Sequence, residues 1–213
     1  MRNKNEFSNF MQEAGVLTFG DFVTKSGRNT PYFVNTGNYK TGKHISILGD
    51  YYADLIVSSG EHYDALYGPA YKGITLVAAA AGSLYRNHGI DKPYFFNRKE
   101  VKDHGEGGSL IGYKPKDGDR IIFIEDVVTA GTAVRESMQI LKAVADITVT
   151  ALFVSVDRME RGTGERSTLD ELKAEHGINV YTIINARDII ESLPEGDERI
   201  KKMEAYLAEY GGR

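Results

Sequence analysis

Residues 120 to 133 of the chain read RIIFIEDVVTAGTA, and this stretch decides the fold class. Its four consecutive apolar residues, Ile121 to Ile124, are too few for a helix and too continuous for a half-exposed strand. Such a run is typical of a buried strand in a parallel sheet. Two acids and a turn of small residues follow, and then a helical pattern begins. The stretch therefore predicts a strand, a loop and a helix in an α/β protein.

The loop of this unit has the composition of an anion site. The first N–H groups of a helix lack partners and carry the positive end of the helix dipole, so a phosphate can bind there. Gly131 lets the backbone approach a ligand closely, and the hydroxyls of Thr129 and Thr132 add donors. Glu125 and Asp126 suit sugar hydroxyls, which need acceptors. The stretch thus fits a phosphorylated sugar, although an acidic strand end before an ordinary turn is the alternative.

The composition describes one globular domain. The chain has 213 residues, of which 41% are hydrophobic and 26% charged, with a net charge of −4. These values predict a single domain over residues 1 to 213, and they argue against general nucleic-acid or membrane-surface binding.

The absence of cysteine excludes disulfides and fits a reducing compartment. Because we find no signal-peptide pattern and no apolar run of about 18 residues, we expect a cytoplasmic protein.

The apolar patterns predict a small hood ahead of an α/β core. A helical pattern from Phe7 to Ala14 ends at Gly15 and is expected to pack over the core. A hairpin or two short strands follow between Val16 and Gly37. Residues 1 to 40 are therefore expected to contribute the hood, and such hoods often carry a substrate pocket.

Strand and helix patterns alternate through the rest of the chain, which predicts a mostly parallel sheet covered on both faces. The expected helices cover residues 44–59, 73–85, 134–144, 169–176 and 198–210, and the expected strands cover residues 65–67, 94–97, 109–113, 147–156 and 180–184.

Three short segments place cations at turns or strand ends. Lys25 lies in TKSGRNTPYFVN, residues 24 to 35, where a solvated turn lysine is the alternative to a ligand contact. Residues 67 to 73 read YGPAYKG, in which Lys72 beside exposed N–H groups can form a second anion site, unless the segment is an ordinary βα loop. Arg158 follows Asp157 at another strand end, where its planar fork suits a carboxylate or an edge ion pair.

Residues 98 to 108 read RKEVKDHGEGG. Three cations offset three acids, so the segment is not a nucleic-acid arm. Its glycines fit a mobile solvated loop. The sharper interpretation is a catalytic lid whose cations converge on pyrophosphate and exclude water when it closes.

Residues 37 to 44 read GNYKTGKH, which approaches the P-loop pattern G-x-x-x-x-G-K followed by Ser or Thr. His44 replaces the hydroxyl that would bind Mg²⁺. A P-loop NTPase therefore stands as a rival function, and Lys40 and Lys43 are otherwise expected to be surface residues.

Taken together, these segments resemble the orotate phosphoribosyltransferases, a family of type I phosphoribosyltransferases. The resemblance rests on EDVVTAGTA at residues 125 to 133, RKEVKDHGEG at 98 to 107, DRMERG at 157 to 162 and the KSGR and TPYFVN segments, and it covers nearly the whole chain. The family commonly has Ser where this chain has Thr30 and a second Phe where it has Val34, so any stacking at that second position is in doubt. The resemblance implies a mostly parallel sheet flanked by helices with a small N-terminal hood.

The resemblance also implies an activity and a set of site residues. The implied reaction transfers the 5-phosphoribosyl group from phosphoribosyl pyrophosphate (PRPP) to orotate, giving orotidine 5′-monophosphate and pyrophosphate in pyrimidine biosynthesis. The implied catalytic residues are Lys102, His104 and Asp126, and Lys102 or His104 could donate a proton. The implied orotate contacts are Phe33, Val34, Thr129 and Arg158. The implied PRPP contacts are Lys25, Tyr71, Lys72, Arg98, Lys99, Lys102, His104, Glu125, Asp126, Val127, Val128, Thr129, Ala130, Gly131, Thr132 and Ala133.

Mg²⁺ is the expected cofactor, held mainly by the diphosphate and ribose hydroxyls of PRPP rather than directly by the protein. The lid segment is implied to reach into a neighbouring subunit, so a homodimer with shared sites is expected, with neither nucleic acid nor membrane as a partner. Two further rivals share the PRPP motif. A phosphoribosyltransferase for another base should lack the RKEVKDHG and DRMERG segments, and a PRPP-sensing regulator usually needs a nucleic-acid surface that the net charge does not suggest.

Overall fold

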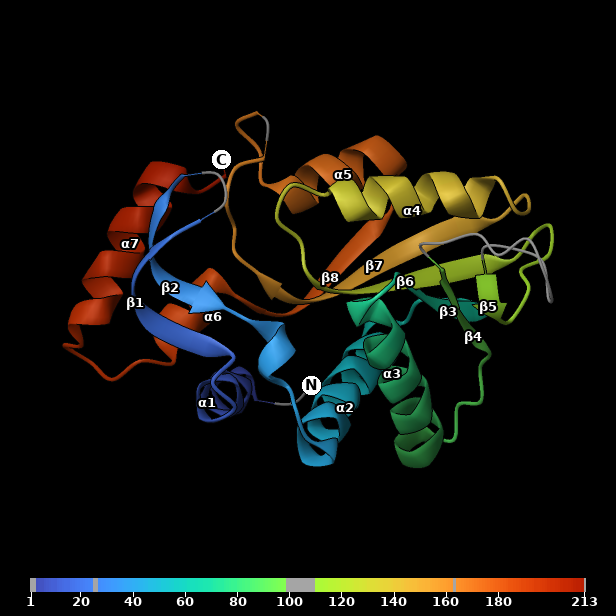
Figure 1. Cartoon of the computed structure of the whole chain (residues 1–213), viewed down its shortest axis with the longest axis horizontal. Helices are drawn as coiled ribbons and strands as arrows, with labels where there is room; N and C mark the ends of the chain where they lie inside the picture. Colours follow the sequence, from blue (N-terminus) through green and yellow to red (C-terminus); the bar gives the residue numbers. More distant parts are fainter. Residues whose placement is uncertain (1–2, 25–26, 99–109, 163, 213) are drawn as a thin grey trace.

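The computed structural model describes residues 3–24, 27–98, 110–162 and 164–212. The strands of its main sheet are β3 (Ala65–Gly68), β4 (Tyr94–Asn97), β5 (Leu110–Gly112), β6 (Arg120–Val127), β7 (Thr148–Asp157) and β8 (Asn179–Asn185). This six-stranded sheet has the order β5-β4-β3-β6-β7-β8 (Figure 1). Neighbouring strands are parallel except for β5, which pairs antiparallel with β4. The predicted α/β class with a mostly parallel sheet is therefore confirmed.

Strand β6 is buried on both faces. Ile121 and Phe123 pack in one hydrophobic cluster, Ile122 and Ile124 pack in another, and all four side chains are fully buried. Successive residues of a strand point to opposite faces, so a strand covered on both faces needs a continuous apolar run. Each such side chain stabilises the fold by about 1.5–3 kcal/mol when it leaves water.

Helices cover both faces of the main sheet. On one side lie α2 (Gly42–Ser59) and α3 (Lys72–His88), and on the other lie α4 (Thr132–Lys142) and α5 (Thr168–His176) (Figure 1). Leu48 of α2 belongs to the cluster of Ile122, whereas Val134 of α4 belongs to the cluster of Phe123. Across the described residues, no helix combines the length and apolar character needed to cross a bilayer.

The N-terminal residues form a second sheet of two antiparallel strands, β1 (Leu17–Val23) and β2 (Asn29–Val34). Helix α1 (Lys4–Glu13) buries Phe7, whose ring centroid lies 4.6 Å from that of Tyr51 on α2. Strand β2 packs against α7 (Glu198–Tyr210), where the rings of Tyr32 and Tyr206 lie 6.3 Å apart. The predicted first helix and two short strands are confirmed, and the small sheet lies beside the main one (Figure 1).

One helix is missing from the sequence prediction, and the end of another is misplaced. Helix α6 (Ala186–Glu191) is not predicted, because it is too short to show an apolar period. Its sequence signal is a capping box, in which Asn185 and Asp188 exchange side-chain-to-backbone hydrogen bonds. The extension of α4 to Val144 is wrong, since the helix ends at Lys142 and Val144 is 44% exposed.

The P-loop alternative does not fit the structure. A P-loop joins a strand of a parallel sheet directly to a helix, but β2 belongs to the two-stranded antiparallel sheet. The intervening residues form the 3₁₀ turn η1 (Thr36–Asn38), and the Thr41 hydroxyl caps α2 by accepting from the His44 N–H at 3.1 Å. Lys40 and Lys43 are exposed, as expected for surface residues.

The substitution Gly68→Ala tests the close contact between β3 and α3. A Cβ on Gly68 would lie 2.1 Å from the carbonyl oxygen of Gly73, whereas a Cβ on Gly82 would meet nothing within 4 Å. We expect Gly68→Ala to lower the free energy of unfolding by about 1–3 kcal/mol in urea titrations. The control Gly82→Ala should raise it by about 0.5–1 kcal/mol, because alanine is the better helix former. Equal stability of the two variants would contradict this packing.

Candidate active site

The polar residues predicted for function converge at one edge of the main sheet. Strands β3, β6 and β7 are parallel neighbours, so their carboxyl ends share an edge. Lys72 begins α3 after β3, Asp126 lies near the end of β6, and Arg158 follows β7. Ligands of open α/β sheets bind outside the carboxyl ends of the strands. The candidate site is therefore built on three neighbouring strand ends.

Asp126 is buried and receives hydrogen bonds from a cation and a hydroxyl. The residue is 6% exposed. The Nζ atom of Lys72 donates to Asp126 Oδ2 at 2.8 Å and to Thr36 Oγ1 at 2.9 Å. The Thr36 hydroxyl donates to the same oxygen of Asp126. Two separate elements, α3 and η1, thus supply the partners of this carboxylate.

Hydrogen bonds also hold the main chain at the end of β6. The Tyr52 hydroxyl donates to the Glu125 carbonyl oxygen at 2.6 Å, and the Ser155 hydroxyl donates to the Asp126 carbonyl oxygen at 2.7 Å. The Asp126 N–H donates to Glu125 Oε1 at 3.0 Å. A buried backbone group needs a partner within the protein, and these contacts fix the strand end that carries both acids.

The pKa values of the two neighbouring acids are shifted in opposite directions. Burial raises the pKa of Glu125, and the adjacent Asp126 charge adds to the rise. Burial acts in the same direction on Asp126, but hydrogen bonds from Lys72 and Thr36 outweigh it and lower the pKa of Asp126. The pKa values of the pair are therefore shifted apart, so Asp126 is the acid that ionises first, and the ammonium of Lys72 balances its charge.

The turn between β6 and α4 leaves the start of the helix open. Gly131 has a φ of 75°, in the left-handed region that favours glycine, and α4 has no side-chain N-cap. Arg135 Nη1 donates to the Ala130 carbonyl oxygen and the Thr168 hydroxyl donates to that of Thr129, each at 2.7 Å. The turn is thus held through its carbonyl oxygens, while its N–H side can accept an anion. Its exposed residues are Thr129, Ala130, Thr132 and Ala133.

Asn97 holds the loop that precedes α3. The Tyr67 hydroxyl and the Ala70 N–H both donate to Asn97 Oδ1, at 2.8 and 2.9 Å. Tyr71 follows, 65% exposed, and its peptide bond with Ala70 is cis. Asn97 ends β4 and directly precedes Arg98, so one side chain ties this loop to the start of the segment predicted to be a lid.

Arg158 is buried against the two-stranded sheet, and its guanidinium carbon lies 4.3 Å from the centre of the Tyr32 ring. Its Nε donates to Glu160 Oε1 at 2.7 Å, and its Nη2 donates to Thr30 Oγ1 at 3.1 Å. The Tyr206 hydroxyl of α7 donates to the same Glu160 oxygen at 2.7 Å. The guanidinium therefore has a fixed orientation.

One segment of chain reaches both Arg158 and Asp126. Thr30 contacts Arg158, and Thr36 contacts Asp126. The predicted orotate contacts Phe33 and Val34 lie between these two positions, and Phe33 is 42% exposed. Residues 30–36 thus form a continuous wall from the predicted base-binding arginine to the predicted ribose-binding carboxylate.

Comparison with known proteins identifies the family. No protein-family model matches the chain. An orotate phosphoribosyltransferase of Clostridium beijerinckii is 49% identical over 220 residues, which covers 99% of this chain and 98% of that protein. Another, from Thioalkalivibrio sulfidiphilus, is 49% identical over 211 residues, covering 98% of each chain. A crystal structure of orotate phosphoribosyltransferase from Francisella tularensis matches with a TM-score of 0.88 at 38% identity, covering 97% of this chain and 100% of that one.

The chain belongs to the orotate phosphoribosyltransferase family. The predicted family and its type I phosphoribosyltransferase fold are confirmed. The structure brings Lys72 and Asp126 together with the turn of residues 127–133, and it brings Arg158 to the strand of Phe33 and Val34. The roles of all these residues stay predictions. Lys25, Lys99, Lys102 and His104 lie outside the described residues.

The sequence does not predict a site role for three residues of this member of the orotate phosphoribosyltransferase family. Thr36 follows the TPYFVN segment without a motif of its own, Asn97 is predicted only as the last residue of a strand, and Tyr206 only as part of a helix. Each acts through a contact between elements far apart in sequence, which no local pattern encodes. Glu160 is the partial exception, since it lies within the DRMERG segment.

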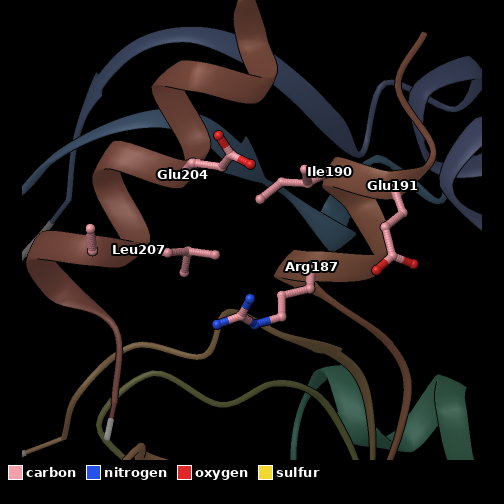
Figure 2. A pocket seen from close by; sticks show the side chains of 6 residues that line it. Arg187, Ile190, Glu191, Glu204 and Leu207 are labelled. Carbon is pink, nitrogen blue, oxygen red and sulfur yellow. The ribbon is translucent and has the colours of Figure 1, made fainter. Parts of the chain in front are cut away.

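Two other features of the described residues bear on where a ligand could bind. Among the described residues, no three side chains of His, Asp or Glu gather as a metal site. A groove of about 360 Å³ lies between α6 and α7, and none of the predicted site residues lines it (Figure 2). Its lining residues are Arg187, Ile190, Glu191, Glu204, Leu207 and Ala208.

Glu125→Gln tests the charge state of the acidic pair. Because the pKa of Glu125 is raised by folding, its neutral form gives stability that is fully present below the unfolded value of 4.5. That stability is lost as pH rises through the folded value. We expect urea titrations at stepped pH to show this decline in the wild type and a flatter profile in Glu125→Gln. The control Glu136→Gln, on an exposed position of α4, should follow the wild type. An unchanged decline in Glu125→Gln would contradict a raised pKa of Glu125.

Proposed function

We propose that this protein transfers the 5-phosphoribosyl group from PRPP to orotate, forming orotidine 5′-monophosphate and pyrophosphate in pyrimidine biosynthesis. Its relationship to orotate phosphoribosyltransferases, at 49% identity over 99% of the chain, carries the proposal. The site supports it, because one edge of the sheet offers an open helix start, a buried anion with a cation beside it, and a fixed arginine.

The turn of residues 127–133 suits the 5′-phosphate of PRPP. Its exposed hydroxyls and the N–H groups at the start of α4 are donors, and the helix dipole favours an anion there. Asp126 and Glu125 precede this turn directly, so a ribose whose phosphate occupies the turn would place its hydroxyls against them. An ionised Asp126 accepts hydrogen bonds, and a neutral Glu125 can also donate one.

Pyrophosphate suits the loop of Tyr71 and Lys72. The Lys72 side chain is 59% exposed and ends on Asp126, so it can move to a phosphate oxygen without disturbing the core. Arg98 would approach from the end of β4. Lys25, Lys99, Lys102 and His104 would complete the cationic surround, with residues 98–108 acting as the lid.

The chemical step breaks the bond between ribose C1′ and the pyrophosphate oxygen, and the bonding electrons leave with pyrophosphate. A ring nitrogen of orotate, whose acidic proton is lost to solvent, then supplies the electron pair of the new C–N bond. Asp126 would offset positive charge on the ribose, while Lys72 and the lid cations stabilise the leaving group. Lys102 or His104 would donate a proton to the departing pyrophosphate.

Orotate suits the wall of residues 30–36. The planar fork of Arg158 matches a carboxylate or a pair of carbonyl oxygens, and it is already held by Glu160 and Thr30. Main-chain groups of Phe33 and Val34 would bind the edge of the orotate ring. Such main-chain contacts do not depend on the side chain, so they tolerate valine at position 34. Thr129 would touch both substrates, since it opens the phosphate turn.

The cofactor, assembly and compartment follow from the same proposal. Mg²⁺ would be held mainly by PRPP and would neutralise charge on its diphosphate, as suits an ion that keeps several waters and uses few protein ligands.

The protein would act as a cytoplasmic homodimer whose lid segments serve the partner's site. Residues 1–40 would contribute the hood of a single catalytic domain. We propose neither nucleic-acid nor membrane binding.

Substrate preference tests the assignment. With PRPP and Mg²⁺, we expect the purified protein to consume orotate in strong preference to uracil, adenine or hypoxanthine, because Arg158 suits the carboxylate that the other bases lack. Loss of orotate absorbance and chromatography of the nucleotide product measure this. Equal or better turnover of a purine would indicate a transferase for another base. Binding of PRPP with turnover of none of these bases would indicate a regulator.

Subunit mixing tests the shared site. Lys102→Ala and Asp126→Asn should each be nearly inactive. If the lid acts in the partner's site, random exchange makes half of the dimers mixed, each with one intact site, so activity should recover to about a quarter of the wild-type value. Differently tagged subunits prove the exchange, and each variant mixed with itself is the control. Proven exchange without recovery would contradict a lid that acts across the interface.

A further inference from the structure

Thr36 is a fixed partner of Asp126. Thr36 belongs to η1, and two hydrogen bonds anchor this part of the chain to the residues that follow α1. The Asn35 N–H donates to the Val16 carbonyl oxygen at 2.8 Å, and Asn38 Nδ2 donates to the Gly15 carbonyl oxygen at 2.7 Å. Thr36 itself is only 9% exposed. Its hydroxyl therefore has little freedom to leave the carboxylate.

Lys72 is a movable partner of the same carboxylate. Its side chain is 59% exposed, and four rotatable bonds let its ammonium reach other acceptors. The proposed function requires this movement, because Lys72 is expected to bind pyrophosphate. When Lys72 leaves, the Asp126 carboxylate loses one of the two donors that its Oδ2 atom has among the described residues.

Most of the remaining contacts of the strand end lie on the main chain. Tyr52 and Ser155 bind carbonyl oxygens of the main chain, and the Asp126 N–H binds Glu125. These bonds fix the backbone, and at the side chain the Glu125 carboxyl is a hydrogen-bond partner of Asp126 in addition to Lys72 and Thr36. A carboxylate that must accept ribose hydroxyls needs its second oxygen, Oδ1, held at one angle.

We propose that Thr36 is a positioning residue for the ribose of PRPP. Its hydroxyl holds Asp126 Oδ2, aims Oδ1 at the ribose hydroxyls, and continues to do so after Lys72 has moved to the pyrophosphate. The inference rests on the proposed function, in which Asp126 binds the ribose. Thr36 acts through Asp126 and is not itself a catalytic residue.

The two threonines at the ends of the 30–36 wall allow a crossed experiment. Thr36→Val removes the hydroxyl on Asp126, and Thr30→Val removes the hydroxyl on Arg158, with the same change of atoms. We expect Thr36→Val to raise the KM for PRPP about tenfold, since a hydrogen bond to a charged group is lost, while the KM for orotate changes less than about twofold. Thr30→Val should show the reverse, and Thr36→Ser should restore the wild-type KM for PRPP.

Each outcome decides between the alternatives. Calorimetric titration of PRPP without orotate should show the same weakening in Thr36→Val, and unfolding midpoints show whether the variants are folded. The positioning role would be overturned by an unchanged KM for PRPP, by equal changes in both KM values, or by tighter PRPP binding. Tighter PRPP binding would indicate that the Thr36 hydroxyl instead holds Lys72 away from the pyrophosphate. The wild-type protein is assayed in parallel, so absence of its turnover would instead count against the proposed function.

Discussion

A buried carboxylate at the end of the central strand is the constraint on which the site depends. Strand β6 must be apolar on both faces to lie in the middle of the core, so any charge it bears has to appear where it leaves the core. Asp126 appears there at 6% exposure, and an unpaired charge at such a position would be costly. Lys72 and Thr36 meet this need. The same requirement thus brings the start of α3 and the turn η1 to the end of β6.

The ion pair that results is suited to exchange rather than to stability. Lys72 is largely exposed, so water screens its attraction for Asp126 and the pair contributes little to folding. A weak, exposed partner can be replaced by a ligand at small cost, whereas a buried one cannot. The raised pKa of Glu125 acts in the same direction, because a second negative charge beside Asp126 would compete for Lys72.

The sequence predicts the parts of the site that lie along single elements. The run Ile121 to Ile124 predicts the central strand, and the small residues after Asp126 predict the open start of α4, because both depend on local composition. It does not predict Thr36 or Asn97, whose roles arise only when η1 meets β6 and when β4 meets the loop after β3. Nor does it predict α6, where a capping box rather than an apolar period defines a short helix. A pattern along the chain cannot specify a contact between segments whose separation is set by the whole topology.

The arginine side of the site shows how far such contacts extend. A buried guanidinium needs a counter-charge, and Glu160 supplies it from two residues further along the same loop. Glu160 in turn accepts from Tyr206 of α7, and the Tyr32 ring of β2 lies near both Arg158 and Tyr206. The orientation of Arg158 therefore depends on the two-stranded sheet and on α7, neither of which belongs to the main sheet. The parallel sheet can place an arginine at a strand end, but the N-terminal strands and α7 determine where its fork points. In an enzyme of this family, that division would let the main sheet hold the phosphoribosyl group while the flanking elements select the base.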